Sequence, residues 1–144
     1  MVLLSSGDHV VASADFYGGT YGLMTEELPR FCIEVSMADM QDPESYKAAI
    51  QENTKMLYIE TLSNPVLKVC DIEAMATIAR AHDLLLVIDN TFTTPWGCQP
   101  IDMGCGLVIP SPTTYPGRPR CTPFLRSVAL SLCMCFIVAG SPPP

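Results

Sequence analysis

Residues 84–88, Leu-Leu-Leu-Val-Ile, place the strongest constraint on the fold, because this continuously apolar run leads straight into an acid, Asp89. Apolar side chains on both sides of a strand require cover on both faces, which is typical of an inner strand of a parallel sheet. We therefore expect residues 84–88 to form a strand that is buried on both faces.

Strand patterns and helix patterns alternate along the first 109 residues. We expect strands at residues 9–13, 32–36, 56–60, 84–88 and 107–109. We expect helices at residues 21–28, 43–51 and 72–82, a turn at 15–20 and one helical turn at 100–104. Asp42 and Asp71 stand where a side chain can cap the second and the third helix. The alternation predicts an α/β domain with a mostly parallel sheet and flanking helices.

Composition divides the chain into two unlike segments. Its 144 residues are about the length of one domain. All fifteen Asp and Glu lie at or before Asp102, whereas residues 111–144 carry three Arg and no acid. Eight of the thirteen Pro lie from Pro110 onward. We therefore expect residues 1–115 to form a partial folded domain and residues 116–144 to be an unrelated tail, either disordered or read from a shifted frame.

The composition also argues against several classes of protein. The acidic first segment has no basic stripe, which argues against nucleic-acid binding. The longest apolar run, residues 128–140, is shorter than the roughly 20 residues that a membrane span needs. The first residues lack the charged region of a signal peptide, and the seven Cys are odd in number and irregularly spaced. We expect a cytoplasmic protein with reduced thiols that does not contact a membrane.

Three polar groups follow expected strands, at residues 61–65, 89–91 and 111–115. Ligands of parallel α/β sheets bind beyond the carboxyl ends of the strands. If the three strands are neighbours, these polar groups converge on one cleft.

Asp89 has two interpretations from the residues alone. Its carboxylate follows five apolar residues, and a buried carboxylate needs a cation or several donors to stay charged. The candidate partners are a metal ion, an Arg or Lys, and the protonated nitrogen of a pyridine ring. Alternatively, Asp89 caps the turn that begins with Asn90 and Thr91.

Two further motifs are ambiguous in the same way. Asn64 precedes Pro65, an arrangement typical of a turn. Residues 17–20, Tyr-Gly-Gly-Thr, form either a flexible turn or a loop that offers an aromatic face to a flat ligand. The chain has no GxGxxG or GxSxG motif, and His9 and His82 lack the spacing of metal ligands.

Three motifs together carry a family resemblance. Tyr-Gly-Gly-Thr occupies residues 17–20, Ser-Asn-Pro at 63–65 follows a Glu-Thr strand end, and Val-Ile-Asp-Asn-Thr-Phe occupies 87–92. From about residue 5 to about residue 115 the chain resembles the Cys/Met-metabolism family of pyridoxal-phosphate enzymes, which includes cystathionine γ-synthase, cystathionine β- and γ-lyases and methionine γ-lyase. The resemblance implies a fragment of the large cofactor-binding domain of a type I pyridoxal-phosphate enzyme.

The resemblance assigns roles to three of the residues already singled out. Tyr17 matches the Tyr that stacks on the cofactor ring and assists proton transfer, so it is also the expected catalytic residue. Asn64 matches the Asn near the ring hydroxyl. Asp89 matches the Asp that pairs with the pyridinium nitrogen and keeps it protonated, so that the ring can accept carbanion electrons. The expected cofactor is pyridoxal 5′-phosphate.

A further family motif, Ser-x-Thr-Lys-Tyr, is altered in this chain. Ser111 and Thr113 match the Ser and Thr that contact the cofactor phosphate, and Tyr115 matches the Tyr. Thr114 stands where the family has the Lys that forms the Schiff base. Because a hydroxyl cannot form that imine, we expect the chain to be inactive alone.

The family also implies substrates and partners. It acts on sulfur-containing amino acids of the cystathionine, homocysteine, cysteine or methionine type, by carbon–sulfur cleavage or by γ-synthase chemistry, and it forms homotetramers. We expect this chain to lack an N-terminal part and a C-terminal domain that family members have. One alternative is a non-catalytic fragment that pairs with full-length subunits, and another is an α/β domain that binds a metal ion through Asp89.

Overall fold

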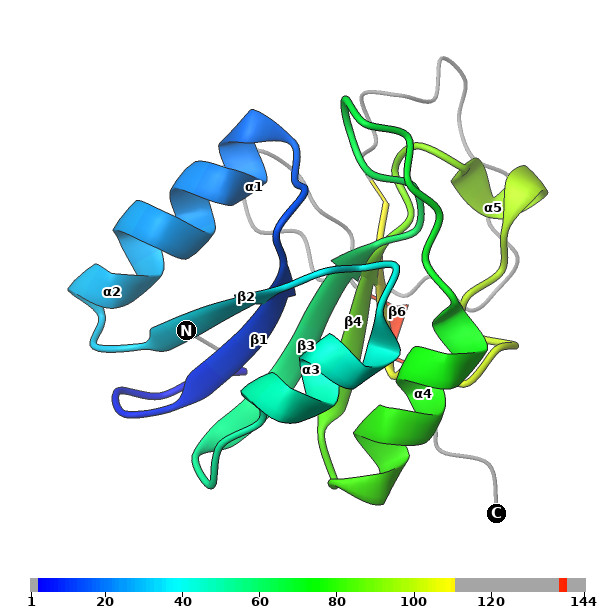
Figure 1. The fold of residues 1–144 in the computed structure, drawn as a ribbon. Coiled ribbons are helices and arrows are strands. Elements are labelled where there is room, and N and C mark those ends of the chain that lie inside the picture. The colour runs from blue at the N-terminus through cyan, green and yellow to red at the C-terminus, as the bar shows by residue number, and fades with distance from the viewer. Residues whose placement is uncertain (1–2, 111–137, 140–144) are drawn as a thin grey trace.

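The computed structural model describes residues 3–110 and 138–139, in which six strands form one sheet of order β2-β1-β3-β4-β5-β6 (Figure 1). The strands are β1 (His9–Ser13), β2 (Glu34–Ala38), β3 (Thr54–Glu60), β4 (Leu85–Asp89), β5 (Leu107–Ile109) and β6 (Val138–Ala139). Every pair from β2 to β5 is parallel, and β6 is antiparallel to β5. The predicted α/β class with a mostly parallel sheet is confirmed.

Helices cover the two faces of the sheet, as Figure 1 shows. On one face lies a continuous helical segment made of α1 (Gly18–Gly22), the π-helical η1 (Leu23–Glu27) and α2 (Leu28–Arg30). On the other face lie α3 (Pro43–Ala49) and α4 (Ile72–Ala81), while the short α5 (Thr94–Gly97) follows β4. No helix in the described part of the chain is long and apolar enough to cross a membrane.

Each face of the sheet packs its own apolar core, and the run that ends at Asp89 contributes to both. Leu86 and Ile88 belong to the cluster beneath α3 and α4, together with Met75 of α4. Val87 belongs to the opposite cluster, together with Met24 of the first helical segment. The run is therefore buried on both faces, as the sequence predicts.

Both expected capping residues start their helices. Asp42 Oδ1 accepts a hydrogen bond from the Glu44 backbone N–H at 3.1 Å, which begins α3. Asp71 Oδ1 accepts one from the Ala74 backbone N–H at 3.0 Å, which begins α4. Each bond satisfies an N–H that has no partner within its helix.

The expected turn at residues 15–20 is partly wrong, because the helix begins at Gly18, three residues before the expected start. Tyr17 is the N-cap in an extended conformation, and its carbonyl accepts a hydrogen bond from the Tyr21 N–H at 2.9 Å. The helix start could not be predicted from local propensity, because its first turn contains two glycines and glycine has a low helix propensity. The expected helical turn at residues 100–104 is a series of hydrogen-bonded turns, and α5 was not expected.

Candidate functional site

The strand order creates a switch point between β1 and β3. From β1 the chain moves outward to β2, then returns past β1 and continues in the other direction through β3, β4 and β5. Loops that leave two adjacent strands in opposite directions open a crevice at the carboxyl ends of those strands. Tyr17 lies in the loop after β1 and Asn64 in the loop after β3, so both lie where such a crevice is expected.

The three strands that carry the expected polar groups are neighbours, which was the condition for their convergence. Within the parallel pairing, Glu60 at the end of β3 is the register partner of Asp89 at the end of β4. Asp89 is in turn the partner of Ile109 in β5. The loops after β3 and β4 therefore leave the same edge of the sheet side by side.

Asp89 is half-buried, and its two carboxylate oxygens have different surroundings. Oδ1 accepts a hydrogen bond from the Thr91 backbone N–H at 2.9 Å, so Asp89 does cap the turn that follows it. Oδ2 accepts a long hydrogen bond of 3.4 Å from the Tyr58 hydroxyl. A bond of that length is weak, so Oδ2 retains the capacity to accept from a second donor.

Glu60 connects two expected site residues, although it is not itself among the site residues expected from the sequence. Its side chain is only 5% exposed. Oε1 accepts a hydrogen bond from the Tyr17 backbone N–H at 3.1 Å, and Oε2 accepts one from the Asn64 backbone N–H at 3.3 Å. An acid that ends an otherwise apolar strand, as Glu60 does in Met-Leu-Tyr-Ile-Glu, was the available signal.

The environment of Glu60 has competing effects on its charge. Burial raises the pKa of the Glu60 carboxyl above its ordinary value, and the nearby Asp89 raises it further. The hydrogen bonds from the Tyr17 and Asn64 backbones act in the opposite direction, because N–H donors stabilise the charged carboxylate.

Tyr17 presents its ring to solvent and is 60% exposed. Gly19 lies directly beside this ring: a Cβ atom at Gly19 would sit 3.0 Å from Tyr17 Cε1 and 3.4 Å from Cδ1. The absence of a side chain at Gly19 therefore lets the ring take its position. An exposed aromatic face at the rim of the crevice is suited to stacking against a flat ligand.

Hydrogen bonds and an ion pair hold the loop that carries Asn64. The Lys68 N–H donates to the buried Ser63 hydroxyl at 3.0 Å, and Leu62 pairs with Val69 in an isolated β-bridge. Lys68 Nζ lies 2.6 Å from Asp15 Oδ2, which ties the loop after β3 to the loop after β1. Asn64 itself is half-buried and joined to Pro65 by a cis peptide bond.

Asn90, next to Asp89, is a structural residue. It is buried, and its Nδ2 donates to the Cys98 carbonyl at 3.0 Å. Its Oδ1 accepts from the Thr93 hydroxyl, which lies 2.8 Å from the Thr61 hydroxyl. These bonds fix the segment around α5 to the end of β3.

The expected phosphate loop is not among the residues that the structure describes. Ser111, Thr113, Thr114 and Tyr115 all lie outside them, as does the expected tail apart from residues 138–139. The described chain reaches Pro110, one residue after the Asp89 partner Ile109.

Residues 3–110 contain no group of three or more His, Cys, Asp or Glu that could hold a metal ion. His9 is buried among hydroxyls instead, with Nδ1 at 2.7 Å from Thr54 Oγ1 and Nε2 at 2.9 Å from Ser36 Oγ. Of the cysteines in the described residues, Cys70 is buried and Cys32 is exposed.

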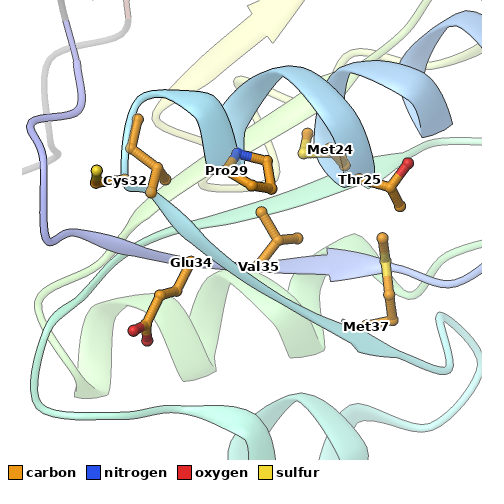
Figure 2. A pocket seen from close by; sticks show the side chains of 8 residues that line it. Met24, Thr25, Pro29, Cys32, Glu34, Val35 and Met37 are labelled. Carbon is orange, nitrogen blue, oxygen red and sulfur yellow. The ribbon is translucent and has the colours of Figure 1, made fainter.

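A hollow of about 570 Å³ lies between the first helical segment and the edge strand β2. Figure 2 shows Val35 and Met37 of β2 pointing toward the helix, while Glu34 points away. The hollow is lined by Met24, Thr25, Pro29, Cys32, Ile33, Glu34, Val35 and Met37. None of the expected site residues lines it, so its position does not coincide with the crevice at the strand ends.

The fold and the site define an α/β domain whose polar groups gather at the carboxyl edge of a parallel sheet, around a switch point. The chain belongs to the Cys/Met metabolism PLP-dependent enzyme family, whose model matches residues 1–117.

Named relatives support this family. The chain is 48% identical over 117 residues to cystathionine gamma-lyase of Bacillus subtilis, covering 81% of this chain and 31% of the relative. It is 46% identical over 115 residues to cystathionine beta-lyase of Lactococcus lactis subsp. cremoris, covering 80% and 30%. The fold also matches a Campylobacter jejuni structure described as an O-acetylhomoserine (thiol)-lyase, with a TM-score of 0.72 and 39% identity. The match covers 74% of this chain and 27% of that structure, which contains N'-pyridoxyl-lysine-5'-monophosphate. The chain thus spans less than a third of the length of these proteins.

Proposed function

We propose that this chain is a piece of a pyridoxal-phosphate-dependent enzyme of sulfur amino-acid metabolism, of the carbon–sulfur lyase or cystathionine γ-synthase type. We propose further that the piece binds the cofactor without linking to it and does not catalyse alone. The observation that carries the proposal is the junction at Glu60, which joins Tyr17 and Asn64 by hydrogen bonds and is the register partner of Asp89.

The residues at this junction fit the groups of pyridoxal phosphate. Asp89 Oδ2, which accepts a long hydrogen bond from the Tyr58 hydroxyl, suits a protonated ring nitrogen as a further donor. The exposed Tyr17 ring suits stacking on the pyridine, and Asn64 suits the ring hydroxyl. By resemblance, the hydroxyls of Ser111 and Thr113 would hold the phosphate.

Each of these residues has a separable task. When bound, pyridoxal phosphate supplies an electron sink for a carbanion. Asp89 holds the proton on the ring nitrogen, because a carboxylate stabilises an adjacent cation more than a neutral amide does. By resemblance, Tyr17 would stack on the ring, orient it and assist proton transfer. Thr114 has no amine, so the chain lacks both the covalent anchor and the proton carrier that a lysine supplies.

The substrate class follows from the relatives rather than from contacts in this chain. The relatives carry the names of a γ-lyase and a β-lyase of cystathionine. We propose a sulfur-containing amino acid of the cystathionine, homocysteine, cysteine or methionine type as the substrate of the whole enzyme. We propose a cytoplasmic location and a homotetramer for that enzyme, as in its family.

The test of cofactor binding is a titration of the full chain with pyridoxal phosphate, followed by absorbance and by quenching of the Trp96 fluorescence. We expect saturable one-to-one binding, with weaker binding of pyridoxal because it lacks the phosphate. Binding that does not saturate, or that is equal for both compounds, would contradict the proposed site.

We also propose that residues 116–144 do not belong to the family domain. The family model matches only residues 1–117, and the change in Pro and charge content occurs at the same place. Resequencing the coding DNA on both sides of this point tests the idea. Another frame that restores family sequence after residue 115 supports a shifted frame as the origin of the tail, and independent reads that reproduce the present tail contradict that origin.

A second candidate role is pairing with full-length subunits. Large apolar side chains are exposed in the segments that follow β3 and β4, among them Val69 at 67% and Trp96 at 98%. Exposed apolar groups of this kind mark contact surfaces. Native mass spectrometry of the chain mixed with a longer family member tests this role, and a chain that remains a lone monomer counts against it.

A further inference from the structure

We propose that Glu60 is a positioning residue whose single carboxylate sets the backbones of Tyr17 and Asn64 relative to each other. The two side chains that flank the crevice would then be aligned by one buried group. This inference rests on the proposed function, because binding of pyridoxal phosphate is what requires Tyr17 and Asn64 to be aligned.

The Glu60 carboxylate bridges the loop that contains Tyr17 and the loop that contains Asn64. Tyr17 precedes Glu60 by 43 residues and follows β1, whereas Asn64 follows β3, so the two amides belong to loops that diverge from the switch point. Each amide donates to a different oxygen, at 3.1 Å from Tyr17 and 3.3 Å from Asn64. The side chain is 5% exposed, so water competes little for these bonds.

A carboxylate is suited to accept hydrogen bonds from two N–H donors at the same time. Both of its oxygens accept and neither donates. A glutamine of the same size would accept with one oxygen but place its NH₂ group against the second N–H. Replacing the carboxylate by an amide therefore removes one hydrogen bond and adds a donor–donor contact, while the volume of the side chain stays the same.

Lys68 provides a second link between the same loops, but of a different kind. Its ion pair with Asp15 joins side chains that remain 29% and 24% exposed. A partly exposed ion pair holds its partners less tightly than a buried bridge, because water and salt screen it. Glu60 therefore contributes the alignment, while Lys68 and Asp15 keep the loops close.

The position of Asp89 couples Glu60 to the proposed cofactor. The Asp89 charge opposes ionisation of Glu60, and the two residues are register partners on adjacent strands. A protonated ring nitrogen beside Asp89 would offset that charge and favour the charged Glu60, which accepts both N–H bonds. Cofactor binding is thus expected to increase the hydrogen-exchange protection of the Tyr17 and Asn64 amides.

Hydrogen exchange of individual amides in the full chain tests the bridge directly. In Glu60→Gln, we expect the Tyr17 and Asn64 amides to exchange about tenfold faster or more, in line with the loss of bonds to a charged group. The Thr61 amide is the internal reference, since it donates to the Asp89 carbonyl at 3.0 Å rather than to the Glu60 carboxylate. Glu52→Gln, at an exposed acid before β3, is the matched control and is expected to change none of the three rates.

The second measurement is the affinity for pyridoxal phosphate. Together with the Thr61 exchange rate, it distinguishes a loss of alignment between Tyr17 and Asn64 from a loss of the fold. We expect Glu60→Gln to weaken binding about tenfold, and Glu52→Gln to leave it unchanged. If Glu60→Gln also exposes the Thr61 amide, the variant is unfolded and Glu60→Asp replaces it. Aspartate keeps the charge but is one methylene shorter, so at least one of the two amides is expected to lose protection while Thr61 keeps it.

Two results would overturn the inference. One is unchanged exchange of the Tyr17 and Asn64 amides in a folded Glu60 variant. The other is faster exchange with unchanged cofactor affinity, which would make the bridge irrelevant to binding. A wild-type chain that binds no pyridoxal phosphate would instead refute the proposed function, and the exchange rates would still decide whether the bridge exists.

Discussion

Glu60 and Asp89 end two adjacent parallel strands as register partners, so that two acidic side chains stand together at the carboxyl edge of the sheet. Their tasks differ, since Glu60 accepts from the backbones of two loops whereas Asp89 caps its own turn with one oxygen. Such a pair of carboxylates is held at a cost, because the Asp89 charge disfavours the charge on Glu60 and raises its pKa. A cation bound at Asp89 would relieve that cost.

Asp89→Asn is expected to weaken binding of pyridoxal phosphate about tenfold or more, because an amide forms a weaker, uncharged hydrogen bond with a protonated ring nitrogen. A fluorescence titration measures the change. The fold is expected to persist, since the Asn oxygen can still accept from the Thr91 N–H. Asp83→Asn, at an exposed site after α4 with positive φ, is the matched control because Asn tolerates that conformation. Equal affinities for the two variants would refute the role of Asp89.

Gly19→Ala is expected to stabilise the chain and yet weaken cofactor binding severalfold. Alanine raises helix stability by about 0.5–1 kcal/mol relative to glycine. The new Cβ, at 3.0 Å from Tyr17 Cε1, forces the ring to move. Gly22→Ala is the control, because no atom outside its own helix backbone and chain neighbours lies within 4 Å of its Cβ position. Urea unfolding of both variants measures the change in stability, and cofactor titration measures the change in affinity. A Gly19→Ala chain that binds the cofactor as tightly as Gly22→Ala would contradict the role of the Tyr17 ring.

Much of the fold could be predicted from the sequence. The apolar run before Asp89 predicts an inner strand, because a short segment of continuously apolar residues is typical of a strand that is buried on both faces. Asp42 and Asp71 marked two helix starts because a side-chain oxygen before a helix has one common local task. The strands β3, β4 and β5 are neighbours, as convergence of the polar groups that follow them requires.

The rest of the site depended on contacts between distant residues. Nothing near Tyr17 in the sequence signals that its amide donates to Glu60, 43 residues later. The helix start at Gly18 could not be predicted from the sequence, because glycine has a low helix propensity. In the structure, the helix starts there because the Tyr21 N–H donates to the Tyr17 carbonyl.

His9 is expected to make stability depend on pH. Burial lowers its pKa below the ordinary value of 6.5, with a smaller opposing effect from Glu34. The unfolded chain therefore binds this proton more tightly, and stability falls as pH decreases through 6.5 until the folded His9 titrates. The slope is at most about 1.4 kcal/mol per pH unit. Glu60 acts in the opposite direction, since its raised pKa favours the folded state as pH falls through that pKa.

Urea unfolding of the wild type and of His9→Gln, from about pH 5 to about pH 8, checks this prediction. We expect the slope to decrease in the variant, because Gln has no titrating proton. His82→Gln, at an exposed residue after α4, is the control and is expected to keep the wild-type slope. An unchanged slope in His9→Gln would show that His9 does not titrate in this range.

The central claim is that this chain carries a pyridoxal-phosphate site from which the linking amine is missing. Thr114→Lys restores that amine, and borohydride reduction followed by peptide mass mapping measures covalent capture of the cofactor. We predict one reduced adduct per chain at position 114 in the variant, and no stoichiometric adduct in the wild type, whose lysines are Lys47, Lys55 and Lys68. A stoichiometric wild-type adduct at one of these lysines, or a variant without an adduct at position 114, would contradict the claim.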